Sequence, residues 1–505
     1  MTALERAISR PDPVSGFGVR SPLHGLARRS VGFFDVLAQS VSAVAPSAAA
    51  TTVVLLIAGV APSAIVPAVL IAGVLSLLVA RTVSQFARRF AAAGSVYTYT
   101  ARGMGPGPGL AAGAAIVVGY GAVAMFTLLG GAYYTTLLLG AFWPAAQGPA
   151  AVAAVLVAEA ALLVLLLVRG IRISARVALV IEVVSVALIV ALLVALLVQM
   201  GPIDPAVLLP SDDVSPAALA AGALIALTAF VGFESAATLG VEARTPLRTV
   251  PRAIAWTVLV SVCLYLLSAV TQVAGFAAIG GTLADSVSPI NELAVAFGLG
   301  GWGVVADVGI AASFLACAIG STTALSRVLF TMGRDHVLPG VVGRTHRRWG
   351  TPVGALVVSL PVVTLVPLAL VLGGVDVRAA MHLTIALGGA GYIVAYVLVC
   401  VAAPLFLRRI GELTPGAVVT AVVSAVALTA ALVAFFAVDA ASGGGVIWLV
   451  VLTAIAACTA IVWRMRRGGV SLEGIGTYDE PVVAQVLGGV VRGSAPPDAG
   501  EEPDA

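Results

Sequence analysis

Apolar runs of about twenty residues recur along this 505-residue chain and restrict how it can fold. A helix needs about 20 apolar residues to cross the hydrocarbon core of a bilayer. Twelve runs are close to that length or longer, at about residues 32–57, 63–81, 108–138, 150–168, 177–200, 216–240, 253–275, 302–326, 352–373, 380–407, 416–438 and 446–463. Only 10% of the residues are charged, against roughly 25% in soluble globular proteins. We therefore predict an all-α integral membrane protein with twelve transmembrane helices.

The placement of arginine predicts the orientation of these helices. The chain has no lysine, and the cytoplasmic loops of membrane proteins collect positive charge. With the N-terminus in the cytoplasm, every arginine except Arg378 falls on the cytoplasmic side. The loops on the other side carry Asp204, Asp212, Asp213, Asp285, Glu292, Asp376 and Asp439. We expect a multi-pass protein of the cell membrane with both termini in the cytoplasm.

The two ends of the chain differ from its apolar core. Residues 1–30 are polar and carry arginine, and they show no short apolar segment with a signal-peptide cleavage site. Residues 464–505 end in GSAPPDAGEEPDA and are rich in proline, glycine and acidic residues. We expect a flexible cytoplasmic arm over 1–30 and a disordered cytoplasmic tail over 464–505.

Several classes of protein are disfavoured by the residues that the sequence lacks. The four cysteines lie inside apolar runs, so we interpret them as buried thiols rather than disulfides. The four histidines are scattered without HExxH-type spacing, and no glycine-rich loop ends in Gly-Lys-Ser or Gly-Lys-Thr. We therefore expect neither an enzyme nor an ATP-driven pump, with no metal, cofactor or nucleic-acid partner.

Two of the predicted helices contain residues that interrupt helical structure. The first contains Pro46, which lacks a backbone donor and clashes with the preceding turn, within a serine-rich stretch. The sixth contains Gly232 and Glu234 at mid-depth. Unwound backbone is tolerated at membrane depth only where it is buried in protein or lines a cavity. Two such helices five spans apart are expected of an inverted repeat with its site at the repeat interface. Close packing through small residues is the alternative interpretation.

Four further segments carry a family resemblance. They are FVGFESAATLGVEARTPLRTVPRAI at 230–254, AGSVYTYTARGMGPGPGLAAG at 93–113, RGIRISARVALVIE at 169–182, and SRVLFTMGRDHVLPGVVGRTHRRWGTPVGA at 326–355. In that order they resemble the sixth helix and following loop, the approach to helix 3, the helix 4–5 connection and the helix 8–9 connection of the amino acid–polyamine–organocation (APC) permeases. The segments are spread through about residues 32–460.

The resemblance implies a leucine-transporter-type fold. Two inverted five-helix repeats, here 31–200 and 216–407, would have helices 1 and 6 broken and would be followed by two extra helices at 416–463. The resemblance also implies alternating-access transport of amino acids or related amines. Helix 1 of the family often breaks at a Gly-small-Gly sequence, whereas this chain has SAVAP at 42–46. The sequence therefore leaves the geometry of this break open.

The resemblance also indicates where a substrate would bind. Backbone N–H groups at a broken helix attract a carboxylate, and free carbonyl groups accept from an ammonium group. The expected substrate-binding residues are Ser42, Ala43, Val44, Phe230, Val231, Gly232, Phe233 and Glu234, with Tyr265 as a weaker candidate. Glu234 belongs to this set because an ionisable residue inside a membrane span marks a functional site. It would bind a substrate amine, take up a proton or hold the helix break in place, and we favour the last role.

The coupling candidates are Glu182 and Ser185 on helix 5, and Ser321 and Thr322 on helix 8. Some members of the family couple to protons through a lysine on helix 5. Since this chain has no lysine, Glu182 becomes the candidate proton carrier, unless it pairs with Arg172 or Arg176. In sodium-coupled relatives of the fold, hydroxyl groups on helix 8 bind the ion.

Secondary active transport is the function that these observations predict. No arginine lies at mid-membrane depth, which disfavours acidic substrates and favours neutral amino acids. We favour proton-coupled symport, with amino acid/polyamine exchange, sodium-coupled symport and a transport-fold sensor as alternatives. The major facilitator fold is disfavoured because the loop between spans 6 and 7 is short. The expected partners are the small-molecule substrate and the lipid bilayer, and the oligomeric state is left open.

Overall fold

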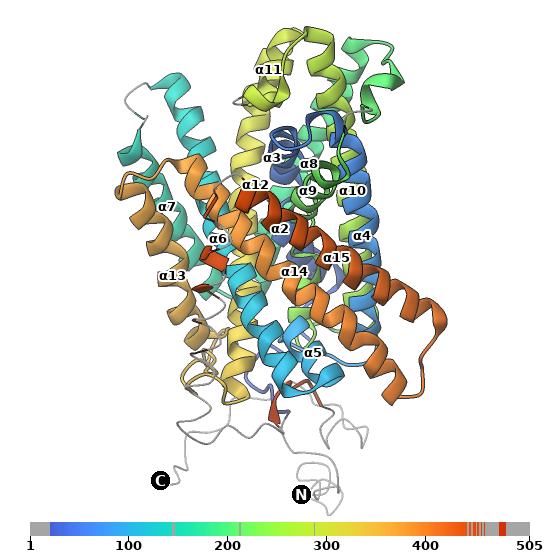
Figure 1. The fold of residues 1–505 in the computed structure, drawn as a ribbon. Helices are drawn as coiled ribbons and strands as arrows, with labels where there is room; N and C mark the ends of the chain where they lie inside the picture. The colour runs from blue at the N-terminus through green and yellow to red at the C-terminus, as the bar shows by residue number, and fades with distance from the viewer. Residues whose placement is uncertain are drawn as a thin grey trace, which may run out of the picture.

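The computed structural model describes residues 21–441 except 144, 145, 147, 212, 213 and 287, then residues 444 and 445, several residues between 448 and 459, and residues 474–480. Helices make up nearly all regular structure in this part of the chain (Figure 1). Its β-structure is limited to an isolated parallel bridge between Val31 and Ala243. Eleven helical stretches of the described chain are long and apolar enough to cross a membrane. The expected all-α membrane architecture is therefore confirmed.

The observed helices follow the predicted spans. Their bounds are α2 Phe33–Val44, α3 Pro46–Ala58, α4 Ile65–Ala87, α5 Val96–Met104, α6 Pro106–Phe142, α7 Pro149–Val168, α8 Ile171–Met200, α9 Pro216–Thr228, η4 Phe233–Leu239, α10 Pro246–Ile279, α11 Pro289–Ala296, α12 Gly300–Arg334, α13 Val353–Leu372, α14 Val377–Arg409 and α15 Pro415–Ala441. The first span consists of α2 and α3, and the sixth of α9 and η4. The twelfth predicted span, 446–463, lies largely outside the described residues.

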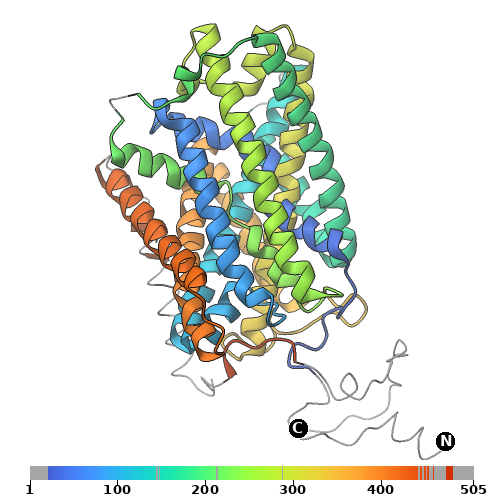
Figure 2. The same cartoon turned by 90° about the vertical axis from the view of Figure 1, so that its right-hand side faces the viewer.

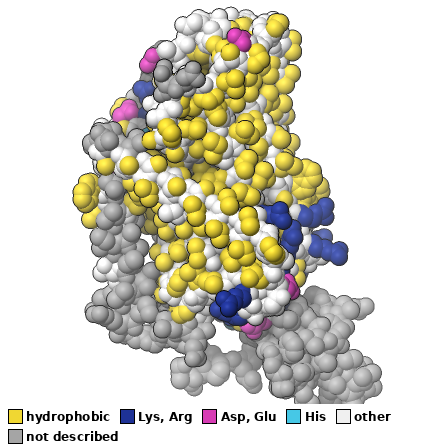
Figure 3. Space-filling model, turned by 45° about the vertical axis from the view of Figure 1, so that its right-hand side comes forward, with side chains coloured by type: hydrophobic (Ala, Val, Ile, Leu, Met, Phe, Trp, Pro, Cys, Tyr) yellow, Lys and Arg dark blue, Asp and Glu magenta, His cyan; other side chains and the backbone are white. Residues whose placement is uncertain are grey.

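The membrane helices form an inner and an outer group. In the most apolar stretch of α12 67% of the residues are buried, and in α6 and α14 61%, whereas α7 has 28% and α15 only 22%. α15 packs obliquely against the outside of α14, α9 and α4 (Figure 2). Hydrophobic side chains cover most of the face seen in Figure 3, with arginines gathered toward its lower part. Such an apolar outer surface is suited to contact with lipid tails.

Part of each polar end of the chain packs against the helices. Residues 21–31 lead into α2, and Gly474–Glu480 bind beside them, with Ile475 5% exposed and the Asp479 side chain 0% exposed. We name this end of the bundle the arginine-rich end, after Arg28, Arg29, Arg89, Arg244 and Arg327. The sequence predicted a flexible arm over 1–30 and a disordered tail over 464–505; within that tail, Ile475 and Asp479 are instead buried against apolar and charged partners.

Candidate transport site

The first membrane span is broken at Ala45. α2 ends at Val44 and α3 begins at Pro46. Between them Ala45 has φ 50° and ψ 61°, a left-handed conformation that costs a non-glycine residue roughly 1–2 kcal/mol. Pro46 explains the position of the break, because it has no N–H and its ring clashes with the preceding turn. The SAVAP sequence therefore breaks the helix without a Gly-small-Gly pattern.

The sixth span is broken between Thr228 and Phe233. α9 ends at Thr228, and Gly232 has φ 103°, before η4 begins at Phe233. A Cβ atom on Gly232 would lie 2.6 Å from the carbonyl oxygen of Ala43. Glycine is therefore needed at this position both for its backbone conformation and for close approach. The two breaks touch each other at this point.

Side-chain bonds to backbone groups hold the two broken spans together. The Ser40 hydroxyl donates to the Phe233 carbonyl at 2.6 Å, and the Ser235 hydroxyl donates to the Gln39 carbonyl at 3.1 Å. The Gln39 amide in turn donates to the Gly320 carbonyl of α12 at 2.8 Å. These polar groups are buried, and each bond uses a main-chain acceptor close to a break. The breaks are therefore fixed relative to each other and to α12.

A cavity lies between the two breaks, with about 440 Å³ of space between its atoms, opening included. Residues of both breaks line it, namely Ala43, Val44, Ala45, Thr228, Ala229 and Val231. Its remaining wall is largely apolar and includes Val123, Phe126, Phe314 and Ile385. The N-terminal end of α3 favours an anion and the C-terminal end of α9 a cation, because helix ends carry unpaired backbone groups and opposite dipole charges. The cavity thus combines the polar ends that a zwitterion needs with an apolar wall.

The predicted substrate residues divide into two groups. Ala43, Val44 and Val231 line the cavity. The other members are buried behind its lining, namely Ser42, Phe230, Gly232, Phe233, Glu234 and Tyr265. The Tyr265 hydroxyl donates to the carbonyl of Ala229 at 2.8 Å, so it supports the backbone of the sixth-span break from behind.

Glu234 is held by two tyrosines. It is fully buried; the Tyr120 hydroxyl of α6 donates to Oε1 at 2.6 Å, and the Tyr396 hydroxyl of α14 donates to Oε2. The Tyr396 hydroxyl also accepts from the Gly232 N–H at 3.3 Å. The carboxyl group therefore joins α6, η4 and α14 behind the break. Tyr396 was absent from the predicted site, although its spacing of four from Tyr392 places both rings on one helix face.

Glu182 lies near the first-span break, and only one of its two carboxyl oxygens accepts a well-formed hydrogen bond from the described residues. It is fully buried on α8, and the Ser313 hydroxyl of α12 donates to its Oε1 at 2.7 Å. Ser313 also accepts from the backbone N–H of Ala48, a residue that lines the cavity, at 3.3 Å. Glu182 Oε2 and the buried Ser47 hydroxyl make no hydrogen bond of ordinary geometry with the described residues, although the Ser47 and Glu182 side chains lie close together. One residue thus separates this carboxyl group from the cavity wall, and the described residues leave one of its oxygens without a well-formed hydrogen bond.

Arg176 does not pair with Glu182. Its Nε instead lies 3.4 Å from Oδ1 of Asp35 on α2, and its side chain is 66% exposed. The predicted pairing of Arg176 with Glu182 is therefore wrong, because the arginine lies almost two turns nearer the start of α8 and pairs with α2. The side chain of Arg172, the other predicted partner, lies outside the described residues.

The polar residues of α12 do not form a single site. Ser313 binds Glu182, whereas Cys317 donates to the Ala43 carbonyl at 3.3 Å and lies 3.7 Å from Ser321. Thr322 is buried, and its hydroxyl has no hydrogen-bond partner within the described chain. Ser185 packs against Gly309, about one turn from Ser313, with 3.6 Å to a Cβ placed on that glycine. The coupling candidates therefore form two separate groups. Glu182 and Ser185 lie near Ser313, whereas Ser321 and Thr322 lie about two turns further along α12.

A buried ion pair lies further along α12, toward the arginine-rich end. Arg327 of α12 donates to both carboxylate oxygens of Glu242, at 2.7 and 3.0 Å, and the two side chains are 3% and 1% exposed. Breaking such a buried pair by removing one partner costs about 3–5 kcal/mol. On the opposite side the cavity shares Leu56, Thr228 and Ile385 with a second space, also lined by His382, of about 550 Å³. The described residues contain no group of three His, Cys, Asp or Glu side chains able to hold a metal ion.

Comparison with known families and proteins agrees with this geometry. Residues 35–417 match the sequence model described as "Amino acid permease". The chain is 28% identical to the uncharacterized transporter Rv1999c of Mycobacterium tuberculosis over 296 residues, 57% of this chain and 64% of that one. It is 30% identical to the branched-chain amino acid permease BcaP of Lactococcus lactis subsp. cremoris over 203 residues, 39% of this chain and 40% of the permease. The matches therefore span less than two thirds of these relatives.

Two solved structures resemble the whole bundle. The Eremococcus coleocola manganese transporter, in complex with an aromatic bis-isothiourea substituted compound, superposes with a TM-score of 0.54 at 14% identity, covering 86% of this chain and 95% of that one. MhsT in complex with L-phenylalanine gives a TM-score of 0.53 at 15% identity, covering 81% and 99%. At such low identity the likeness establishes the fold alone, which is the leucine-transporter type.

Proposed function

Since the chain belongs to the amino acid permease family, we propose that it is a secondary active transporter of neutral amino acids with apolar side chains. It would work by alternating access in the cell membrane, with both termini in the cytoplasm. The observation that carries the proposal is the cavity between the two helix breaks, lined by residues of both breaks and by apolar residues of other helices.

The cavity's composition supports this class of substrate. An α-amino acid places its carboxylate toward the N-terminal end of α3 and its ammonium group toward the C-terminal end of α9. Its side chain then meets Val123, Phe126, Phe314 and Ile385. No arginine is among the residues that line this cavity, so an acidic side chain would be buried there without a counter-charge, which is unfavourable. The printed names of the lactococcal permease and of the MhsT complex, which refer to branched-chain amino acids and to phenylalanine, are consistent with an apolar substrate.

Glu182 is the proposed proton carrier. Its buried position penalises a permanent charge, and Oε2, which makes no hydrogen bond of ordinary geometry with the described residues, can be protonated without breaking the bond from Ser313. Ser313 connects the carboxyl group to the N–H of Ala48 at the start of α3. Proton uptake at Glu182 would therefore change the hydrogen bonding of the helix end that receives the substrate carboxylate.

The alternatives within the same fold are sodium coupling and exchange. A sodium site would use the hydroxyl groups of Ser321 and Thr322, and the unpartnered Thr322 hydroxyl is the observation in its favour. Exchange would need no coupling residue, so Glu182 would then be dispensable. Glu234 is assigned a positioning role under each alternative, because both of its oxygens already accept from tyrosines.

Uptake into proteoliposomes tests the proposal. Labelled neutral, cationic and acidic amino acids and polyamines are supplied under an inward proton gradient, an inward sodium gradient, or internal substrate alone. The variant is Glu182→Gln, and the matched control is Glu159→Gln, which changes a partly buried membrane carboxyl on α7. Proton-driven uptake of an apolar amino acid that is lost only in Glu182→Gln supports the proposal. Uptake driven only by sodium would indicate sodium-coupled symport, and flux only against internal substrate would indicate exchange. Ligand-dependent stabilisation without flux would indicate a sensor. Each of these results would contradict the proposal.

A further inference from the structure

Gly474–Glu480 of the C-terminal tail occupy a charged site at the arginine-rich end. The Asp479 carboxylate is 0% exposed and lies 2.9 Å from the Arg28 guanidinium and 2.8 Å from that of Arg29. The Ser21 hydroxyl donates to the same carboxylate at 2.8 Å. Burial lowers the pKa of Arg29, and the charge of Asp479 opposes that change. A carboxylate buried in this way is stable only because donors surround it, and these donors all come from the segment leading into α2.

The other half of the tail segment fits a notch between α5 and the end of α12. Asp335 Oδ2 accepts from the Gly476 N–H at 2.8 Å and from the Tyr97 hydroxyl at 2.7 Å. Burial, and then the charge of Asp335, raise the pKa of Tyr97, so its phenol stays protonated and donates. Arg102 donates to the Gly476 carbonyl at 2.9 Å. Gly476 has φ 87°, and a Cβ there would lie 2.7 Å from the Cβ of Ala101. This position therefore accepts glycine and excludes larger residues.

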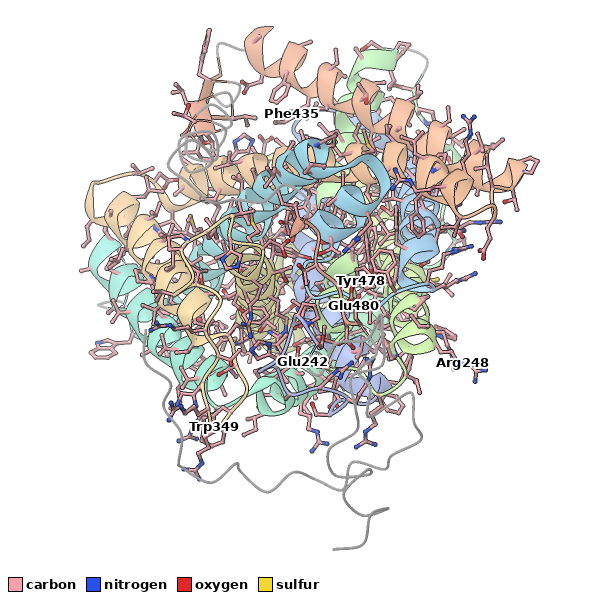
Figure 4. All side chains as sticks on the ribbon, turned by 90° about the horizontal axis from the view of Figure 1, so that it is seen from below. Glu242, Arg248, Trp349, Phe435, Tyr478 and Glu480 are labelled. Atoms are coloured by element: carbon pink, nitrogen blue, oxygen red, sulfur yellow. The ribbon has the colours of Figure 1, made fainter. Side chains whose placement is uncertain are left out.

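An aromatic contact completes the docked segment. The Tyr478 ring lies 5.2 Å from the Phe90 ring, and the Arg102 guanidinium lies 4.4 Å from its centre. The Asp479 N–H donates to the Ala91 carbonyl at 2.8 Å. Seen from this end in Figure 4, Tyr478 and Glu480 lie near the middle of the bundle beside Glu242, whereas Arg248 and Trp349 lie at its rim. The segment thus covers the central part of the arginine-rich end.

The segment leading into α2 is also bonded to the connection between η4 and α10. Arg29 donates to the carbonyls of Gly240 and Ala243 at 3.2 and 3.3 Å. The Val31 N–H donates to the Glu242 carbonyl at 3.0 Å, and the Val31 carbonyl accepts from the Arg244 N–H at the same distance. These two bonds form the parallel bridge between Val31 and Ala243. α2 is a short half-helix with its break at Ala45. If the cavity opened toward this end by a movement of α2 away from η4 and α12, the tail segment could not keep both its bonds to Arg28 and Arg29 and its bonds to Asp335 and Arg102.

We propose that Gly474–Glu480 form an autoinhibitory clasp. The clasp ties the start of α2 to α5 and α12, holds the cavity closed at the arginine-rich end, and limits the transport rate until it is released. The proposal rests on the proposed alternating-access function for its effect on transport. Its effect on cavity access does not depend on which substrate is carried.

The ion pairs of the clasp are weak enough to break and form again. The Arg28 and Arg29 side chains are 23% and 34% exposed, so water weakens their ion pairs with Asp479. Arg89, Arg244 and Arg248 line an adjoining open space of about 1110 Å³. Their positive potential attracts the Asp479 carboxylate back to its site after release. Salt screens this attraction beyond about 10 Å at 0.1 M ionic strength. High ionic strength should therefore open the clasp.

Alkylation of Cys317 measures whether the clasp is closed. Cys317 is buried and lines the cavity at the first-span break. The full-length chain, with Cys263, Cys400 and Cys458 each replaced by alanine, is placed in vesicles whose tail-bearing face is outward. A membrane-impermeant maleimide is then added outside. The variant is Asp479→Asn. The matched control is Glu480→Gln, whose side chain is exposed and whose contact with Arg28 is through its backbone carbonyl.

We expect roughly five-fold faster Cys317 alkylation in Asp479→Asn, as the loss of a partly exposed ion pair predicts, and an unchanged rate in Glu480→Gln. Higher ionic strength should speed the alkylation of Cys317 in the chain with the unmodified tail and not in Asp479→Asn. Tyr478→Ala should act in the same direction as Asp479→Asn, and unchanged hydrogen exchange of α6 and α14 checks that the fold is kept. Equal alkylation in Asp479→Asn and the parent overturns the clasp, even if uptake occurs. Faster alkylation without uptake of any amino acid keeps the clasp and overturns the proposed function.

Discussion

Glu234 and Glu182 are both fully buried carboxyl groups beside the broken helices, but their surroundings differ. Both oxygens of Glu234 accept from tyrosines on other helices. Glu182 accepts from Ser313 through one oxygen, and the other has no hydrogen-bond partner among the described residues. A satisfied buried network stabilises one conformation, whereas a half-satisfied group retains the capacity to bind a proton or ligand. We therefore propose that Glu234 fixes the structure of the site and that Glu182 carries an exchangeable proton.

The largest expected effect on stability comes from a substitution at Gly232, the residue of the sixth-span break that lies next to Glu234 in the structure. In Gly232→Ala the new Cβ would lie 2.6 Å from the Ala43 carbonyl oxygen, at a residue with φ 103°. We expect a loss of about 2–5 kcal/mol in the free energy of unfolding from strain and overpacking, measured by thermal unfolding in detergent, together with loss of transport. Gly121→Ala is the control, since its Cβ would meet Leu325 at 3.9 Å. A variant at Gly232 as stable as that control would mean that the breaks do not touch.

Removing one donor from Glu234 should have the next largest effect. Tyr396→Phe leaves a buried carboxylate oxygen unpaired, and we expect a loss of about 1–3 kcal/mol. Tyr392→Phe is the matched control one turn away, because the Tyr392 hydroxyl has no hydrogen-bond partner in the described chain. That control should lie within about 0.5 kcal/mol of the parent. Equal destabilisation by the two substitutions would remove the distinction between Glu234 and Glu182.

The smallest effect on stability should occur at the Glu182 side. Ser313→Ala removes one hydrogen bond to a carboxyl group that is already half paired, and we expect about 0.5–1.5 kcal/mol. Its effect on proton-driven uptake should be larger than its effect on stability, because Ser313 connects Glu182 to Ala48. Ser326→Ala is the control on the same helix, where the hydroxyl bonds only within α12, to the Thr323 carbonyl. Uptake by Ser313→Ala that equals uptake by Ser326→Ala would contradict the connection.

The sequence predicted those features of the site that depend on local chemistry. Pro46 and Gly232 interrupt their own helices, so the positions of both breaks could be predicted from neighbouring residues. Glu234 stands out because a carboxyl group in an apolar span is costly. Glu182 was named as a candidate because the family resemblance expects a lysine on helix 5 and the chain has none.

Contacts between distant segments could not be predicted in this way. Tyr396 meets Glu234 across 162 positions, and Ser313 meets Glu182 across 131. The bond between Ser21 and Asp479 joins residues 458 positions apart, within a tail whose composition indicated disorder. Spacing along the chain gives the face of a helix that a residue occupies, but the neighbour of that face is set by how whole helices pack.

Proton movement accompanying substrate is the most direct test of the division between the two carboxyl groups. Internal pH is recorded in proteoliposomes when the amino acid taken up fastest is added outside, without an imposed gradient, for the parent chain, Glu182→Gln and Glu159→Gln. We predict acidification of the lumen by the parent and by Glu159→Gln, and none by Glu182→Gln, which should still exchange labelled substrate. Acidification by Glu182→Gln at the rate of the parent chain would contradict the assignment of the proton to Glu182.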